Sequence, residues 1–278
     1  MSAGAFAPPA WIVQRSLPHT PWDDSALARM PGMTPVVGPW IVVDDAYAAQ
    51  MAERARLMRE RPDDVTAVLP EAEDALEELR DVVVADLPPG FRREGGAVRR
   101  PDGEWVALAG APFAVLNRLL QEDLLLLLPR DGEHVLVAGL LCFPANWTLA
   151  EKIGRPLVRI HRPIPAYDAA LARRVQRLFD HARPGRPMWR ANVLAHRTAE
   201  LFHAKPEGAP REDVARPPPF VRSERQTVLR LPRTGAVLFA VHTWIVPFAA
   251  LTAEQRARCP LAGAEGPSRG RAAGEPAP

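Results

Sequence analysis

The sequence predicts an α+β fold in a single large domain, in which helical segments come first and mostly antiparallel strands follow. Two observations support this prediction. Stretches with helical apolar spacing lie before residue 90, and the later segment RQTVLRL–PRTG–AVLFAVHTWIV has the pattern of a β-hairpin. A doubly wound α/β fold is disfavoured, because helices and strands do not alternate along the chain. No GxGxxG motif follows a predicted strand, and no GxxxxGK[ST] motif occurs.

The first ninety residues are predicted to form an extended arm and then two helices. Residues 1–32 are rich in proline and alanine and predict an arm that drapes over the domain. Residues 39–45 (PWIVVDD) predict a short strand and a helix cap, and apolar residues at helical spacing predict a helix over 46–61, which Pro62 ends. A second helix is expected over about 70–87, with a proline at its start and acidic residues in its first turn.

The middle of the chain predicts the change from helices to strands. Residues 91–107 are polar and glycine-rich, which indicates a loop or a hairpin, and residues 112–120 suggest a third helix. The leucine run within 121–128 is short and is followed by a turn, so it predicts a buried strand rather than a helix. Asp131-Gly132 then connects this strand to 135–143 as a hairpin.

The last third of the chain is predicted to hold one amphipathic helix and the main hairpin. The expected elements are a helix over 168–182, strands over 188–194, 225–231 and 236–246, and a proline-rich surface loop over 205–219. The organisation expected from these elements is an arm over residues 1–32, one domain over 33–250 and a disordered tail over 251–278, where alanine, glycine, proline and arginine leave little to bury.

Composition limits the possible classes of function. The chain has 278 residues, a hydrophobic content of 47% and a net charge of +2, so the charge does not indicate a nucleic-acid-binding protein. Lys152 and Lys205 are the only lysines, and this arginine bias is typical of a GC-rich genome rather than of an anion-binding surface. The N-terminus lacks the charged and apolar regions of a signal peptide, and no apolar run reaches the ~20 residues of a membrane span, so we expect no membrane association and a cytoplasmic location.

The two cysteines, Cys142 and Cys259, are too few for iron–sulfur chemistry within this chain. They lie far apart and do not have the spacing of a metal finger. An ordinary iron–sulfur cluster needs four thiolate ligands. If the protein uses electrons, we therefore expect them to come from another chain. Cys142 lies in an apolar run and is expected to be a small buried residue.

The segment from Leu140 to Pro165, LLCFPANWTLAEKIGRPLVRIHRPIP, contains the most distinctive candidate for chemistry. An apolar run over 157–160 ends on His161, and Pro163 and Pro165 follow it. A neutral imidazole held by the surrounding chain is suited to ligate a haem iron. The same pattern also fits an ordinary hydrogen-bonded histidine at the end of a strand, and the pattern alone does not choose between the two interpretations.

Several segments, taken in order over residues 33–248, resemble the haem-dependent oxidative N-demethylase family, the haem-bearing α subunits of dimethylamine monooxygenase-type enzymes. The matching segments are MTPVVGPWIVVDDAY, LPEAEDALEEL, QEDLLLL, CFPANWTLAEKIGRPLVRIHRPIP, RPMWRAN and ERQTVLRLPRTGAVLF. The resemblance implies a PAS-like antiparallel sheet with flanking helices that binds haem b. It also implies that dioxygen and a small methylated amine are substrates, that formaldehyde is released, and that separate subunits with FMN and an iron–sulfur cluster supply electrons from NAD(P)H.

The resemblance also implies which residues form the site. His161 is the candidate axial ligand, with His196 and His242 as the other candidates. Four residues in the matching segments are candidates for cofactor binding, with an ordinary salt bridge as the alternative for the charged ones: Lys152, Arg190, Asn192 and Arg225.

A cationic amine needs a carboxylate or an aromatic face beside it, and Glu224 with Trp244 could supply both. His242 is added to these two as a catalytic candidate. A solvated Glu224 paired with a nearby arginine is the alternative.

Two departures from the family pattern affect the expected activity. The family usually carries Arg-x-Asn-Trp where this chain has Val193 in the last position, and an Ile-Arg-Thr-aromatic segment where this chain has His242 in place of the arginine. Two alternatives to the demethylase therefore remain: a non-catalytic haem-binding PAS-like sensor or carrier, and a haem-free protein that keeps only the fold.

Overall fold

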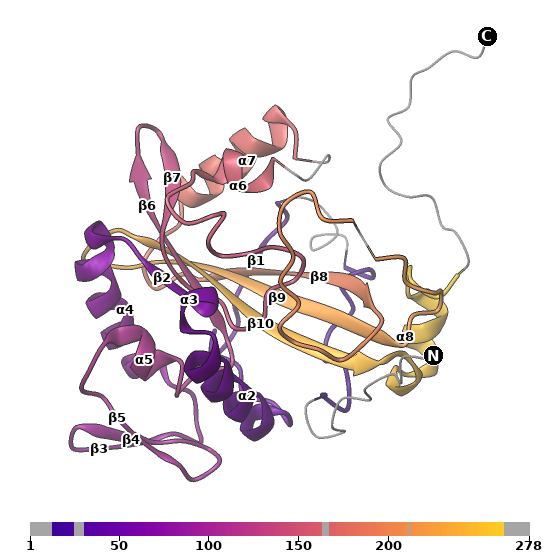
Figure 1. Ribbon diagram of the computed structural model, residues 1–278, viewed down its shortest axis with the longest axis horizontal. Helices are drawn as coiled ribbons and strands as arrows, with labels where there is room; N and C mark the ends of the chain where they lie inside the picture. Colours follow the sequence, from indigo (N-terminus) through magenta and orange to yellow (C-terminus); the bar gives the residue numbers. More distant parts are fainter. Residues whose placement is uncertain (1–12, 25–30, 163–166, 211, 264–278) are drawn as a thin grey trace.

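The computed structural model describes residues 13–24, 31–162, 167–210 and 212–263, and it contains a seven-stranded antiparallel sheet with helices on both faces (Figure 1). The strands, in the order in which they lie side by side, are β1 (Thr34–Pro35), β8 (Met188–His196), β9 (Phe220–Arg230), β10 (Val237–Pro247), β6 (Asp123–Arg130), β7 (Glu133–Leu140) and β2 (Thr66–Val68). The hairpin β6–β7 and the meander β8–β9–β10 are thus joined where β6 meets β10.

Helices and a small second sheet surround this central sheet. The helical elements are α2 (Tyr47–Glu60), α3 (Pro62–Val65), η1 (Pro70–Ala72), α4 (Glu73–Asp86), α5 (Pro112–Leu116), α6 (Leu157–His161), α7 (Ala169–Asp180), η2 (Phe248–Ala250) and α8 (Ala253–Arg258). The small sheet consists of β3 (Arg92–Glu94), β4 (Ala97–Arg99) and β5 (Trp105–Ala107). None of the helices in the described part of the chain is long and apolar enough to span a membrane.

The two faces of the large sheet are distinguished by alternate residues of β9. Val228 packs in a cluster with Leu171, Val175 and Phe179 of α7, so this side is called the α7 face. Leu229, the next residue, packs in the cluster that contains α2, α4 and α5, so the other side is called the α2 face. Because side chains alternate along a strand, even-numbered residues of β9 lie on the α7 face and odd-numbered residues on the α2 face.

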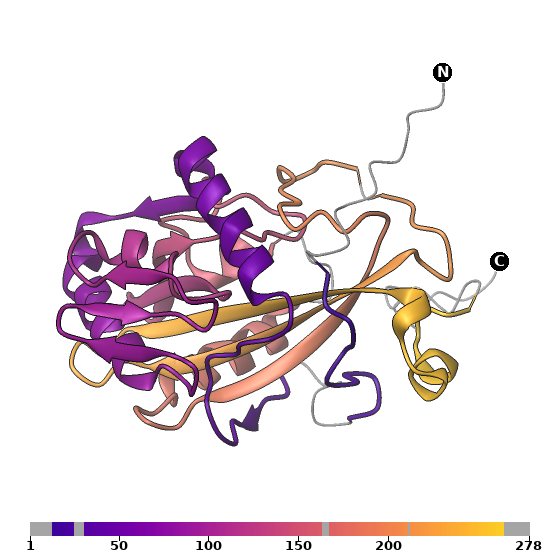
Figure 2. The ribbon, with the colours of Figure 1, turned by 90° about the horizontal axis from the view of Figure 1, so that it is seen from below.

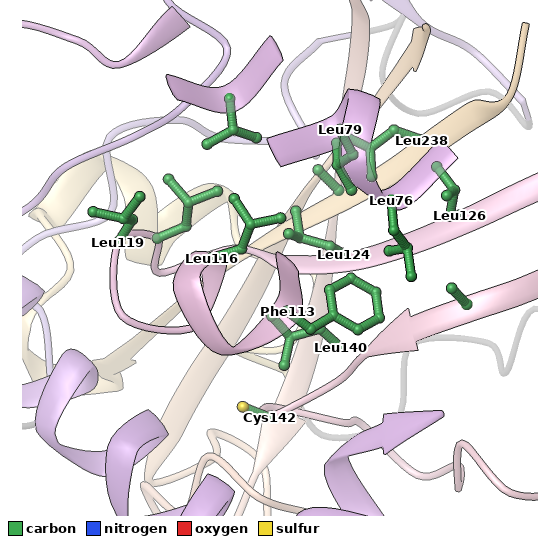
Figure 3. Packing of buried hydrophobic residues seen from close by; sticks show 14 of the residues in the cluster. Leu76, Leu79, Phe113, Leu116, Leu119, Leu124, Leu126, Leu140, Cys142 and Leu238 are labelled. Atoms are coloured by element: carbon green, nitrogen blue, oxygen red, sulfur yellow. The ribbon is translucent and has the colours of Figure 1, made fainter. Parts of the chain in front are cut away.

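The α2 face holds the larger hydrophobic cluster. Figure 3 shows Leu76 and Leu79 of α4 and Leu116 of α5 close to Leu124 and Leu238 of the sheet. Full removal of such leucine side chains from water stabilises a fold by roughly 1.5–3 kcal/mol each. Cys142, labelled in the same view, is fully buried at the edge of this cluster, as expected for a small apolar residue.

The leucine run of β6 is explained by burial on both faces. Leu124 and Leu126 belong to the α2-face cluster, whereas Leu125 and Leu127 belong to the α7-face cluster. A strand covered on both sides has no polar alternation, so its sequence reads as one apolar run. The prediction of a buried strand here is therefore confirmed, and so is the hairpin through Asp131, which adopts a positive φ of 51° before Gly132.

The described part of the N-terminal arm lies against the α2 face beside β10 (Figure 2). Gln14 is fully buried, and its side chain donates to the Thr243 carbonyl at 3.0 Å and accepts from the Ile245 amide at 2.8 Å. Leu17 packs in a third cluster with Val246 and Leu251. Residues 13–24 thus lie against the sheet. The arm over residues 1–32 as a whole stays a prediction, because residues 1–12 and 25–30 lie outside the described residues.

Several predicted elements differ from the structure. Residues 39–45 form no strand: Glu122 and Gln121 instead accept from the Val42 and Asp44 amides, so side chains replace a strand partner. Of the two alternatives predicted for residues 91–107, the hairpin agrees with the structure, where three antiparallel strands form the small sheet, and α5 ends at Leu116 rather than at residue 120. Within the tail expected to be disordered, α8 forms with a capping box between Thr252 and Gln255, and residues 264–278 lie outside the described residues.

Candidate functional site

His161 lies at the end of helix α6, not at the end of a strand, and is half-buried on the α7 side of the sheet. Its Nδ1 lies 2.8 Å from the Leu157 carbonyl oxygen. A carbonyl can only accept, so Nδ1 carries the hydrogen and the neutral ring has its lone pair on Nε2. Burial lowers the pKa of His161, although the bond to Leu157 opposes this. The residue therefore presents a neutral imidazole with one nitrogen committed.

Tyr167 stacks on this imidazole. The two ring centroids are 4.3 Å apart and the ring planes differ by 12°. The Tyr167 hydroxyl is buried, and it has no hydrogen-bond partner among the residues that the structure describes. Burial raises the pKa of Tyr167 to about 12, so the hydroxyl keeps its proton. A buried hydroxyl without a partner is costly, which makes this atom a candidate for contact with a bound molecule.

Arg190 lies on the α7 face as well, and this cation has no carboxylate partner among the described residues. It is paired with Gln226 across β8 and β9, and its Nη1 donates to the Gln226 side chain at 2.7 Å. Its Nε is buried and unbonded, and no ion pair of Arg190 occurs within the described ranges. Burial lowers the pKa of Arg190, and the nearby charge of Glu224 partly opposes this. A half-buried guanidinium of this kind is suited to bind an anionic group.

Glu224 is held by a network one cross-strand row further along. Asn192 donates to its Oε2 at 2.8 Å, and Arg222 donates to its Oε1 at 3.0 Å. Arg222 is fully buried and also donates to the carbonyls of Leu201 and Phe143. Glu224 is therefore an oriented carboxylate whose charge is already compensated. The alternative expected an arginine partner, which is present, but it also expected a solvated carboxylate, whereas Glu224 is buried.

Lys152 is also engaged within the chain. Its side chain is buried, and its Nζ lies 3.1 Å from Oε2 of Glu207. Arg159 of α6 contacts the same carboxylate at 2.9 Å. Lys152 thus forms a salt bridge in the described structure, which was the alternative to its role as a contact for an anionic cofactor.

His196 lies at the end of β8 on the same face as Asn192. It is 4% exposed, and its ring is 5.1 Å from that of His203. Burial, together with the charges of Arg222 and His203, lowers the pKa of His196 to about 3. This histidine is therefore neutral and remains an alternative ligand on the α7 face.

His242 occupies a different environment on the α2 face. Its Nε2 lies 3.0 Å from Oδ2 of Asp44, and its Nδ1 lies 3.2 Å from Oε1 of Glu122. Burial alone would lower its pKa, but the hydrogen bonds and charges of the two carboxylates raise the pKa of His242 to about 9. Both ring nitrogens donate, so neither has a lone pair for a metal. The residue is a buried cation, the same charge as the arginine expected at this position.

Trp244 belongs to a row of rings on the α2 face. Its centroid is 4.2 Å from that of His242 and 4.9 Å from that of His19. His19 also contacts Trp189 at 5.9 Å, and Arg225 stacks over Trp189 at 5.0 Å. Together with the buried arm, these rings fill the α2 face near β8, β9 and β10.

The sheet therefore separates the residues that the sequence grouped together. Glu224 is paired with Thr243 across β9 and β10, whereas Trp244 is paired with Ser223, so Glu224 and Trp244 lie on opposite faces. The expectation that these two residues share a site is wrong, because the strand register gives them opposite parity. Arg190 and Arg225 are separated in the same way, since Arg225 is paired with Ala191.

Sequence reasoning missed several residues that the structure brings to these sites. On the α7 face these are Tyr167 and Arg222, and on the α2 face they are His19, Asp44 and Glu122. Tyr167 carried a weak signal, because it is one of only two tyrosines and lies six residues after His161. The two carboxylates around His242 carried no sequence signal, because Asp44 and Glu122 are 198 and 120 residues away from it in the chain.

The structure shows no all-protein metal site in its described part: no group of three histidine, cysteine, aspartate or glutamate side chains is placed to hold a metal ion. Among the described residues, His161 keeps one nitrogen without a partner and stacks on Tyr167, whose hydroxyl is also without one, while Arg190 lies on the same face of the sheet. Such a donor set suits a metal that brings its own further ligands better than an all-protein site.

Comparison with known protein families gives a match over most of the chain. A family described as haem-dependent oxidative N-demethylase, alpha subunit-like, matches residues 33–265, which include the whole sheet and helix α8. The match covers most of the 278 residues and extends beyond residue 250, where the sequence placed the end of the domain. The chain belongs to the haem-dependent oxidative N-demethylase α-subunit-like family.

Proposed function

We propose that this protein binds haem b on the α7 face and oxidatively demethylates a small methylated amine. The observation that carries the proposal is the geometry of His161, whose Nδ1 is fixed by the Leu157 carbonyl while Nε2 has no partner among the residues that the structure describes. In haem proteins the non-ligating nitrogen of the axial histidine commonly donates to a carbonyl or carboxylate, which fixes the ring. His242, with both nitrogens engaged, does not have this property.

The connectivity of the sheet supports the choice of face and a PAS-like interpretation of the fold. The β6–β7 hairpin is followed by helices α6 and α7 and then by the β8–β9–β10 meander, with β10 placed beside β6. In this arrangement the helices that connect hairpin and meander cover one face, which is the face that carries Arg190 and Gln226. We therefore place the ligand on this face, which carries Arg190 and is covered by the connection that includes His161.

The residues present fit a haem. His161 would hold the iron, Arg190 would bind a propionate, and the Tyr167 hydroxyl would find a polar partner. Asn192 lies in the next row and is bonded to Glu224, and Lys152 is bonded to Glu207. Each would contact the cofactor edge only by exchanging that bond. Arg225 lies on the opposite face and is not assigned to the cofactor.

When bound, haem supplies the activation of dioxygen, and the electrons come from NAD(P)H through FMN and iron–sulfur reductase subunits on other chains. The chain itself orients the reactants. Glu224 would bind the ammonium form of the amine, because Asn192 and Arg222 hold its carboxylate in one orientation. His161 keeps the cofactor fixed, and the α7-face cluster excludes water from the buried side of the site. The products are the demethylated amine and formaldehyde.

A haem-binding sensor or carrier is the second candidate function, and one observation favours it. Arg222 already compensates the charge of Glu224, which weakens the attraction for a cationic amine. Trp244 and His242, the other catalytic candidates, lie on the α2 face. A sensor would need the haem and the axial histidine but not an amine-binding carboxylate.

Absorption spectroscopy of haem-reconstituted protein tests the proposal. We expect a Soret band that shifts when carbon monoxide is added to the reduced protein, and we expect this band to be lost or shifted in His161→Ala. The matched control is His181→Ala, because His181 makes the same Nδ1 contact with a carbonyl four residues earlier, Arg177, at 2.8 Å but is exposed at the end of α7. An unchanged spectrum in His161→Ala would reject the ligand assignment.

Formaldehyde measurement separates the two candidate functions. With dimethylamine, dioxygen and a chemical reductant, the demethylase should release formaldehyde, and Glu224→Gln should raise KM for the amine while leaving the Soret band in place. Haem reduction and carbon monoxide binding without any formaldehyde would support the sensor or carrier.

A further inference from the structure

The segment between β8 and β9 lies against the turn and the helix that present His161. Ala145 and His203 form an isolated parallel bridge, and the amides of Asn146 and His203 bond to the carbonyls of His203 and Pro144 at 2.9 and 3.1 Å. In Figure 1 this segment follows β8 and runs close to the chain that leads from β7 to α6. It is therefore fastened to the connection that carries the candidate ligand.

Glu207 makes the furthest-reaching contacts of this segment. Both of its carboxylate oxygens accept from Nη1 of Arg159, at 3.1 and 2.9 Å, and Oε2 also accepts from Nζ of Lys152 at 3.1 Å. Its backbone amide lies 3.0 Å from both carboxylate oxygens of Glu151. One residue thus contacts three side chains on the turn and helix before His161.

Helix α6 depends on such contacts. It has only five residues, and its N-cap, Pro156, makes no side-chain hydrogen bond. A helix of this length is not stable by itself, because nucleation costs more than one turn of hydrogen bonds returns. Arg159, two residues before His161, is the side chain of α6 that Glu207 binds. Tertiary contacts therefore decide how α6, and with it the His161 ring, is oriented.

We propose that Glu207 is a positioning residue that holds helix α6, and hence the imidazole of His161, in the orientation needed to ligate the cofactor. This inference rests on the proposed function, and it assigns Lys152 a new role: Lys152 fixes Glu207 rather than a propionate. Because the contacts with Arg159 are partly exposed, with side chains 36% and 26% accessible, salt should weaken them.

The chain offers a matched control in the same segment. Glu212 also forms a partly exposed ion pair, with Lys205 at 3.0 Å, but this pair stays within the segment and does not reach α6. The variants are Glu207→Ala, Glu207→Gln, which keeps the shape but removes the charge, and Glu212→Ala. We would measure the rate of haem transfer to an excess of apomyoglobin at low and high salt, the ferric absorption spectrum, and amide hydrogen exchange of residues 157–162 in the haem-free proteins.

We expect both Glu207 variants to release haem about tenfold faster than the wild type, in the range seen when partners of a metal-ligating histidine are removed. Their release rates should depend less on salt, their ferric spectra should shift, and exchange over 157–162 should be faster. Glu212→Ala should match the wild type in all three measurements.

Three results would overturn the inference: Glu207 variants that behave like the wild type, Glu207→Gln that does so while Glu207→Ala does not, or Glu212→Ala that has the same effect as Glu207→Ala. If wild-type protein binds no haem, the proposed function fails instead. The exchange measurement then still decides whether Glu207 orders α6, because it is made without the cofactor.

Discussion

The two faces of the sheet use the same residue types in opposite ways. On the α2 side, His242 has carboxylates at both nitrogens, Arg54 is bonded to Asp123 at 2.7 Å, and the Tyr47 hydroxyl donates to the Leu119 carbonyl at 2.7 Å.

On the α7 side, His161 has one committed nitrogen, Arg190 has only an amide partner, and the Tyr167 hydroxyl has no partner in the described ranges. Buried polar groups are normally paired in a folded protein. On the α2 side, Nε and Nη2 of Arg54 and Oε2 of Glu122 also lack partners in the described ranges, so the two sides differ mainly in whether a carboxylate neutralises the buried cation. Arg190 has no such carboxylate, which makes the α7 side the better candidate to receive an anionic ligand.

The largest effect is expected from Arg54→Ala on the α2 side. Arg54 and Asp123 are both fully buried, so removal of the arginine leaves an uncompensated carboxylate. We expect a loss of about 3–5 kcal/mol in the free energy of unfolding, measured by urea denaturation. The matched control is Arg56→Ala in the same helix, whose pairs with Glu53 and Glu60 are exposed and should contribute at most about 1 kcal/mol. Equal losses in the two variants would contradict the comparison.

The next largest effect is a pH dependence of the free energy of unfolding, which comes from His242. Its pKa is raised from 6.5 to about 9 by folding, so the protonated ring stabilises the native state fully below pH 6.5, and this contribution is lost as pH rises toward 9. The shift corresponds to a contribution on the order of 3 kcal/mol. His19 and His196 have pKa values lowered to about 4 and about 3, so they change the free energy of unfolding with pH only below pH 6.5. Denaturation between pH 6.5 and 8.5 should therefore show stability falling with pH.

Variants of His242 sharpen this prediction. His242→Gln should abolish the slope and destabilise the protein, because Asp44 and Glu122 then face each other without a cation. His242→Arg restores a cation that does not titrate, so it should also abolish the slope but lose less stability. A pH slope that persists in His242→Gln would show that another group is responsible.

A smaller effect is expected from Gly139→Ala on the α7 side. A Cβ atom at residue 139 would lie 2.5 Å from Cδ1 of Leu149 and 3.3 Å from Cδ2 of Leu125. Overpacking of this kind costs roughly 1–3 kcal/mol. Gly132→Ala is not a suitable control because its φ is +80°, whereas Gly96→Ala meets no atom within 4 Å and should be nearly neutral. If Gly139→Ala leaves the free energy of unfolding unchanged, the α7 face is loosely packed even beneath β7.

The smallest effect on stability is expected when either of the two tyrosines is replaced by phenylalanine. Tyr47→Phe removes a satisfied hydroxyl and leaves the Leu119 carbonyl without its donor, so we expect a loss of about 1 kcal/mol. Tyr167→Phe removes a hydroxyl that has no partner in the described structure, so the haem-free protein should change by less than about 0.5 kcal/mol or become more stable. Thermal denaturation of both variants measures the difference, and the reverse order would argue against a ligand site beside Tyr167.

Much of the fold could be predicted from local pattern. The helices over 47–60 and 169–180 and the hairpins of β6–β7 and β9–β10 follow from periodicity and turn residues. The strand predicted over 39–45 was wrong because the backbone amides of Val42 and Asp44 donate to the side chains of Glu122 and Gln121 rather than to a neighbouring strand, and no local pattern records such contacts. Periodicity predicts which residues are buried, but it does not predict which distant partner buries them.

The candidate site was predicted only residue by residue. His161 and Arg190 were named separately, as ligand and cofactor-contact candidates, and these roles stay predictions. Glu224 and Trp244 were joined although the register separates them. Register depends on how three strands pair, and a shift of one residue exchanges the faces. Glu207 and Tyr167 were missed because their roles arise from contacts with Arg159 and His161 rather than from a motif.

The position of β10 between β9 and β6 has a consequence for synthesis of the protein. Residues 123–127 pair with residues 237–241, so β6 has no neighbour on that side until more than a hundred further residues have left the ribosome. Until then an apolar strand of consecutive leucines presents an unpaired edge, which is the kind of segment that associates with other chains. The nascent protein is therefore most vulnerable to aggregation just before its last long strand emerges.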